Sequence, residues 1–269
     1  MANPIPLNRL PESEEGGKMS FFEHLAELRT RLIHASGAIV AGTFIGVYLS
    51  KHLLEFVARP MVDALRAANL QDKLIFTHPA GYLYQVITLG LYLGIVIASP
   101  YVLYQVWLFV APGLYRNERK AVAGFVVSSV ALFLCGIAFA YYVILPYLLR
   151  FLVNFQTGGA FTPLISVNEY FDLVLNVLLG VGIVFELPVL AFLLSLFGIV
   201  TPRFLWKNFR YAILIIAILA AVITPTPDAV TMLVFMAPMI VLYFVSIGVS
   251  AMVMRSKRRA KAIASQGAD

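Results

Sequence analysis

Two short charged stretches contain the side chains of this 269-residue chain that are best suited to binding chemistry. The stretch at 21–32 places Glu27, and the stretch at 114–120 places Glu118, among basic residues at the end of a long apolar segment. The rest of the chain is largely compatible with a hydrocarbon environment. Carboxylates on one face of a membrane protein suit a cationic ligand, so we expect a cation-binding surface there.

Each of these glutamates also has an ordinary structural interpretation. Glu27 stands four residues before Arg31, which is the favourable order for an ion pair within a helix. Glu118 follows Asn117, a good helix cap, and a negative charge at the start of a helix favours the macrodipole. Both interpretations remain open at the level of the sequence.

A third acid, Glu186, lies inside an apolar segment and is followed by Pro188. An acid within a membrane span costs about 2.5–3.5 kcal/mol on insertion scales, so a functional role is the first hypothesis. The alternative is a protonated carboxyl group that a hydroxyl or a water molecule satisfies inside the bundle.

The composition is that of a protein with several membrane spans. Hydrophobic residues make up 61% of the chain, charged residues only 13%, and the mean hydropathy is +0.87. A soluble domain would carry about a quarter charged residues. The chain has no P-loop, HExxH or GxSxG pattern, its four histidines are scattered, and Cys135 is its single cysteine. We therefore expect no enzyme, no cofactor and no metal site.

Apolar runs and helix-breaking residues predict six spans. The first, at about 32–49, follows an interfacial turn, and an amphipathic segment at 51–73, broken by Pro60, is expected along the far membrane face. The others are expected from Gly81 in the run 74–115 with a kink at Pro100, at 121–149, at 170–200 with an interruption at Glu186, at 211–223, and from Pro227 to about Met254. Loops are expected at 151–167 and 202–210.

The fifth span is short, because 211–223 covers only about 20 Å of a hydrocarbon layer about 30 Å thick. Basic residues set the orientation. Six spans place five of the twenty lysines and arginines on one side (Lys51, Arg59, Arg66, Lys73 and Arg150) and the rest on the other, which predicts both termini in the cytoplasm. Topology and anionic lipid explain the basic C-terminus, so no nucleic-acid partner is expected.

The chain is therefore divided into a flexible cytoplasmic N-terminus at 1–19, a six-span membrane domain at 20–254 and a basic cytoplasmic tail at 255–269. Several motifs in this order resemble the TatC family, the receptor subunits of the twin-arginine protein translocase. They are HLAELRTRL at 24–32, RP at 59–60, SPYVLYQVWLFVAPGLYRNERK at 99–120, FAYYVILP at 139–146, FELPV at 185–189 and TPTPD at 224–228.

The resemblance implies an all-α, cup-shaped bundle of six helices in a bacterial or archaeal plasma membrane. It implies that Glu27 and Glu118 contact the paired arginines of a signal peptide. An arginine pairs with a carboxylate through a planar fork of donors that lysine lacks. Further residues that match functional positions are Arg29 and Phe109 for signal binding, and Pro60, Glu186 and Asp228 for structure or function.

The resemblance also implies partners and an energy source. The expected partners are the signal peptides of folded proteins, single-span proteins like TatA and TatB, membrane lipid, and further copies of the chain, with the proton motive force rather than ATP driving transport. The family often has PPD where this chain has PTPD, and Thr231 is a candidate partner contact beside the apolar Met232. The alternatives are an ion-coupled transporter of a small solute, with Glu186 as its coupling acid, and a structural membrane scaffold.

Overall fold

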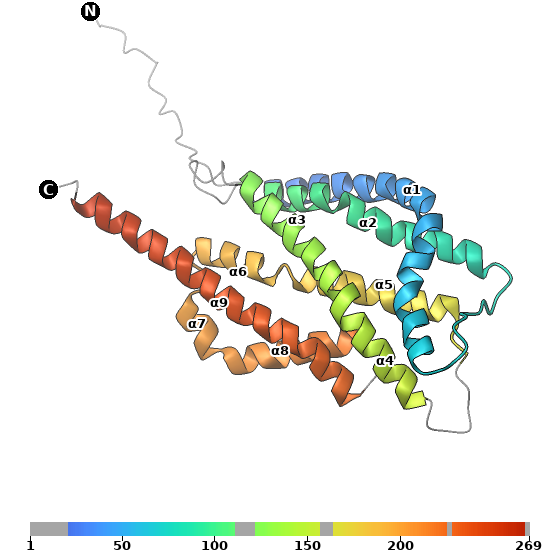
Figure 1. Ribbon diagram of the computed structural model, residues 1–269. Coiled ribbons are helices and arrows are strands. Elements are labelled where there is room, and N and C mark those ends of the chain that lie inside the picture. The colour runs from blue at the N-terminus through green and yellow to red at the C-terminus, as the bar shows by residue number, and fades with distance from the viewer. Residues whose placement is uncertain (1–20, 111–121, 157–163, 225–227, 267–269) are drawn as a thin grey trace, which may run out of the picture.

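A computed structural model describes residues 21–110, 122–156, 164–224 and 228–266, and these residues form a helical bundle (Figure 1). One isolated parallel bridge joins Ile75 to Ser166. The helices are α1 Phe21–Ala67, α2 Gly81–Val110, α3 Val122–Phe139, the π-helical segment η3 Ala140–Ile144, α4 Leu145–Gln156, α5 Val167–Val184, α6 Leu187–Leu196, α7 Pro202–Lys207, α8 Phe209–Ile223 and α9 Ala229–Gln266.

The described residues contain five helical segments long and apolar enough to cross a membrane, and α8 is a shorter apolar helix. The 15 residues of α8 cover about 22 Å, as predicted, against about 30 Å of hydrocarbon. In Figure 1 the start of α1, the end of α2, the start of α3 and the end of α9 lie toward the upper left. The end of α4 and the starts of α5 and α9 lie toward the lower right. The bundle therefore has two ends, and α1 begins at one of them.

The predicted break of the first helix at Pro60 is wrong. α1 runs unbroken through Pro60 and turns sharply part-way along, so that its second arm packs beside α4 (Figure 1). One face of this arm, with Val57, Met61 and Leu65, packs into the buried core, and its charged residues Arg59, Asp63 and Arg66 are exposed.

The protein compensates for the missing amide hydrogen of Pro60 with tyrosine hydroxyls. A proline in a helix leaves the carbonyl four residues earlier, here that of Phe56, without its helical donor. The Tyr141 hydroxyl donates to the Phe56 carbonyl at 2.6 Å, and the Tyr170 hydroxyl donates to the neighbouring Val57 carbonyl at 2.7 Å. Two distant segments, η3 and α5, therefore complete the polar contacts of α1 where Pro60 disrupts them.

Helices α1 and α2 pack closely through glycines. A methyl group at Gly46 would collide with the carbonyl of Gly90, and one at Gly42 would lie 2.6 Å from the carbonyl oxygen of Gly94. Small residues of this kind let two membrane helices approach each other closely. The contact fixes the start of α1 beside the end of α2, which is where the candidate site lies.

Three other boundaries differ from the sequence-based expectations. The expected loop at 202–210 begins with the helix α7, whose cap Thr201 accepts a hydrogen bond from the Phe204 amide at 3.2 Å. The expected loop at 151–167 begins later, because α4 continues to Gln156.

The last helix also continues well beyond Met254, to Gln266. Lysine, arginine and alanine are strong helix formers, so the basic C-terminal stretch extends α9. The Lys257 ammonium donates to the Leu196 carbonyl and so caps the end of α6. The predicted interruption at Glu186 is confirmed, because α5 ends at Val184 and α6 begins at Leu187.

Candidate functional site

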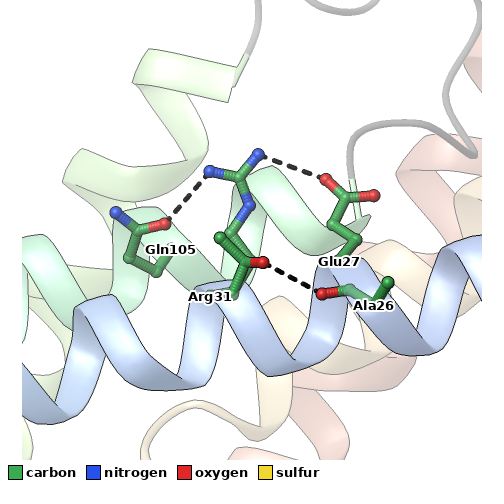
Figure 2. A network of polar contacts seen from close by, with 5 residues as sticks. Ala26, Glu27, Arg31 and Gln105 are labelled. Carbon is green, nitrogen blue, oxygen red and sulfur yellow. Dashed lines mark hydrogen bonds and ion pairs between the residues drawn. The ribbon is translucent and has the colours of Figure 1, made fainter.

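Glu27 lies near the start of α1 and is paired with a basic residue of its own helix (Figure 2). The Arg31 Nη2 donates to Glu27 Oε1 at 3.1 Å, and Arg31 Nη1 donates to Gln105 Oε1 on α2 at 3.3 Å. Gln105 is buried. The ion pair that the spacing predicted is therefore present, and it is part of a bridge between two helices.

The bridge leaves polar atoms unsatisfied. Glu27 Oε2 and Arg31 Nε are both buried and have no hydrogen-bond partner in the structure of the described residues. The Glu27 side chain is 16% exposed and the Arg31 side chain 29%. A buried acceptor without a partner costs about 1–3 kcal/mol, more when it is charged. Glu27 thus holds one guanidinium, and its second oxygen is a buried acceptor without a donor among the described residues.

Phe109 contacts the first turn of α1 through His24, whereas Arg29 lies on a different face of α1 from Glu27. The Phe109 ring, in the last turn of α2, stacks on His24 with the ring centroids 4.3 Å apart, and His24 lies three residues before Glu27. Arg29 is exposed and stands two positions after Glu27, a spacing that places two side chains on different faces of a helix. Glu118 lies outside the described residues.

Two residues of this region had not been predicted as part of the site, His24 and Gln105. Gln105 had a signal in the sequence, since it is a polar residue in a long segment without charges, but nothing local indicated its partner. His24 appeared as one of four scattered histidines and as the first residue of the motif at 24–32, without a role of its own.

Glu186 occupies the break between α5 and α6 and belongs to a separate polar chain. The Ser129 hydroxyl of α3 lies beside its carboxyl group, and Trp107 Nε1 of α2 donates to this hydroxyl at 3.2 Å. Glu186 Oε1 is buried and unpartnered in the described structure. A hydroxyl of the kind that the alternative interpretation required is therefore present, together with a spare acceptor.

The two remaining predicted residues have structural contacts. Pro60 is buried in α1, as described above. Asp228 caps α9, because its Oδ1 accepts from the Thr231 amide at 2.7 Å. Pro227, the expected first residue of this helix, lies outside the described residues. Thr231 is 2% exposed, and its hydroxyl has no partner in the described part, so its side chain faces the bundle rather than a neighbour in the membrane.

The arrangement suits ionic recognition. In the described ranges, no group of three or more His, Cys, Asp or Glu side chains is placed to hold a metal ion. The polar groups near the start of α1 form a guanidinium–carboxylate–amide bridge between α1 and α2.

Comparison with known proteins identifies the family. Residues 23–263 match the family model described as Sec-independent protein translocase protein (TatC). A relative of that name from Koribacter versatilis (strain Ellin345) is 46% identical over 94% of this chain and 93% of its own length. TatCy of Bacillus subtilis (strain 168) is 34% identical over 91% of this chain and 94% of the relative.

The fold is also that of a solved structure. A crystal structure of the twin-arginine translocase receptor TatC superposes with a TM-score of 0.75 at 34% identity, covering 86% of this chain and all of that chain. The match confirms the all-helical membrane fold and the resemblance stated from the motifs. It favours protein transport over an enzyme, a solute transporter or a passive scaffold. The chain therefore belongs to the TatC family, the receptor core of the twin-arginine translocase, and is a multi-pass protein of the bacterial cytoplasmic membrane.

Proposed function

We propose that the bundle end where α1 begins and α2 ends binds the paired arginines of a twin-arginine signal peptide, and that Glu27 takes one of them. The observation that carries this proposal is that Glu27 already accepts from the guanidinium of Arg31 at 3.1 Å while its second oxygen has no partner in the described structure. A carboxylate placed in this way can accept from an incoming arginine, either beside Arg31 or in its place.

Glu118 takes the second arginine. It follows Val110, the last residue of α2, by eight positions and precedes the described start of α3 at Val122 by four. Two carboxylates on separate segments give specificity for a pair of arginines rather than for a single cation. Arg29, Arg31, Arg119 and Lys120 lower the attraction for an isolated cation.

The aromatic pair of His24 and Phe109 supports this surface. Its stacked rings tie the first turn of α1 to the last turn of α2. Glu27 depends on the same two helices for its position, because Gln105 holds Arg31 from α2. Phe109 therefore acts as a positioning residue for the carboxylate and offers an apolar contact next to it.

The chain works with partners in the plane of the membrane. We infer that single-span proteins like TatA and TatB dock against the short helix α8 and the neighbouring α9, that further copies of the chain join the complex, and that the proton motive force drives export. This inference rests on the length of α8, which is shorter than the hydrocarbon layer is thick. A partner helix beside α8 can reduce the effect of this mismatch. Both termini are cytoplasmic in this proposal, as the basic residues predict.

The direct experiment compares two peptides. Purified full-length protein in nanodiscs is titrated with a signal peptide carrying two arginines and with the same peptide carrying two lysines. We expect binding of the arginine peptide and at least tenfold weaker binding of the lysine peptide. Equal affinity for both peptides would contradict recognition through the arginine fork, and a chain that bound neither would fit the scaffold alternative.

A further inference from the structure

A second polar cluster lies at the opposite end of the bundle from Glu27. Here Arg59 and Asp63 of α1 and Arg150 of α4 line one cavity of about 370 Å³ together with Phe56, Tyr141 and Tyr142. All three charged residues are exposed. We call this cavity the basic mouth. Arg59 and Arg150 are two of the five basic residues that the predicted topology places on the side of the membrane opposite to the termini.

The arginines of the basic mouth are available for a ligand. In the part of the chain that the structure describes, neither Arg59 nor Arg150 has a carboxylate within ion-pair distance, and Arg59 lies 5.8 Å from the Phe56 ring centroid. Arg66, further along α1, differs because it donates to Asp72 at 2.8 Å and lowers the pKa of that carboxyl group.

An apolar cavity of about 240 Å³ adjoins the basic mouth, and we call it the apolar chamber. Side chains of α1, α2, α3, η3 and α5 line it, among them Leu89 and Leu175. Phe56, Tyr141 and Tyr142 line both cavities, so the two share a wall. The Phe56 and Tyr141 rings are stacked with centroids 4.6 Å apart, and the Tyr141 hydroxyl donates a hydrogen bond to the Phe56 carbonyl. The shared wall is therefore aromatic, and the Tyr141 hydroxyl within it is already paired.

We infer that the basic mouth and the apolar chamber together bind one aminophospholipid molecule. Its phosphate contacts Arg59 and Arg150, its ammonium group contacts Asp63, and one acyl chain enters the apolar chamber. Arginine is the side chain best matched to a phosphate. Asp63 complements a primary ammonium, whereas a glycerol headgroup carries no cation and a choline headgroup has no N–H to donate. The carboxylate, the two arginines and the apolar chamber thus match the ammonium group, the phosphate and the acyl chain of such a lipid.

The test is native mass spectrometry of the full-length protein, titrated with phosphatidylethanolamine, phosphatidylcholine or phosphatidylglycerol of identical chains. We expect the first phosphatidylethanolamine to bind more tightly than either other lipid.

The double variant Arg59→Gln/Arg150→Gln should weaken that first binding step about tenfold or more, because charged hydrogen bonds are lost. Asp63→Asn should remove the preference for phosphatidylethanolamine. Lys51→Gln, an exposed cation on α1 that lines neither cavity, is the matched control and should change nothing.

Two outcomes would overturn the inference. If the double variant binds the first lipid as tightly as the Lys51→Gln control, the lipid is merely part of the shell around the protein. If glycerophosphoethanolamine, which has no acyl chains, competes as well as the intact lipid, the apolar chamber holds no chain. The variants change exposed side chains, and their melting temperatures show whether the fold is kept. Neither outcome depends on signal-peptide binding at the other end of the bundle.

Discussion

Arg31 and Glu27 form an ion pair at 3.1 Å across one turn of α1, and the same guanidinium reaches Gln105 of α2 at 3.3 Å. An internal arginine thus pairs with the same carboxylate that we propose for a signal-peptide arginine. The structural and functional interpretations of Glu27 are therefore compatible, because the internal pair is a contact that a ligand can share or replace.

Removing the internal arginine should strengthen signal binding. A partly exposed ion pair contributes about 0.3–1 kcal/mol, so Arg31→Gln should raise the affinity for a twin-arginine peptide about twofold to fivefold. Isothermal titration of the variant and the original chain measures this. A clear loss of affinity would instead show that Arg31 positions the carboxylate for the peptide.

The hydroxyl of Tyr141 should matter for stability because of Pro60. Tyr141→Phe leaves the Phe56 carbonyl without its 2.6 Å donor, and the free energy of unfolding should fall by about 1–3 kcal/mol. Tyr142→Phe is the matched control, because the structure gives its side chain a ring contact and 68% exposure but no hydrogen bond among the described residues. Chemical denaturation in detergent provides the measurement.

The same explanation predicts a specific rescue. Pro60→Ala restores a backbone amide that can donate to the Phe56 carbonyl. Tyr141→Phe should therefore lower the free energy of unfolding clearly less in a Pro60→Ala background than in the original chain. An equal loss of unfolding free energy in the two backgrounds would mean that the Tyr141 hydroxyl does not act through the Phe56 carbonyl.

Glu186 should tolerate an amide better than a hydrocarbon. Glu186→Gln keeps the shape and a polar acceptor beside Ser129, so we expect a folded protein that supports transport. Glu186→Leu should fold but transport poorly, because it removes the polar groups at the break between α5 and α6. The measurement is export of a reporter protein, with membrane levels of each variant as the control. Full export by the leucine variant would leave Glu186 as a tolerated buried acid.

Reporter fusions test the orientation on which the site assignment depends. A fusion after Arg150 should be periplasmic and one after Arg116 cytoplasmic, because the basic residues concentrate on the side of Arg116. The reverse pattern would place Glu27 and Glu118 on the wrong side for a signal peptide made in the cytoplasm.

Local patterns in the sequence predicted most of the fold. The start near Gly81, the interruption at Glu186 and the short fifth span follow from apolar length and helix-breaking residues, which act within a few positions. The arm of α1 around Pro60 was missed because its Phe56 carbonyl is satisfied by Tyr141, 85 positions after Phe56 in the chain. No local rule shows a donor at that distance.

In the candidate site, too, contacts between nearby residues were predicted and contacts between distant residues were not. The four-residue spacing predicted the pair of Glu27 and Arg31, because a helix brings such residues together. The third member, Gln105, is 74 positions away from Arg31, and only the close packing of α1 on α2 brings it there. The role of Glu118 stays a prediction, since it lies outside the described residues.

The most direct test of the central claim measures two quantities on the same variants, Glu27→Gln and Glu118→Gln. One is the ratio of affinities for matched arginine and lysine signal peptides, and the other is the melting temperature, with Glu169→Gln at the start of α5 as the control. Loss of a charged hydrogen bond, about 1.5–3 kcal/mol, predicts a fall in the ratio of about tenfold or more in each variant and little change in melting temperature. An unchanged ratio together with a lower melting temperature in both variants would contradict the account and leave the two glutamates with purely structural roles.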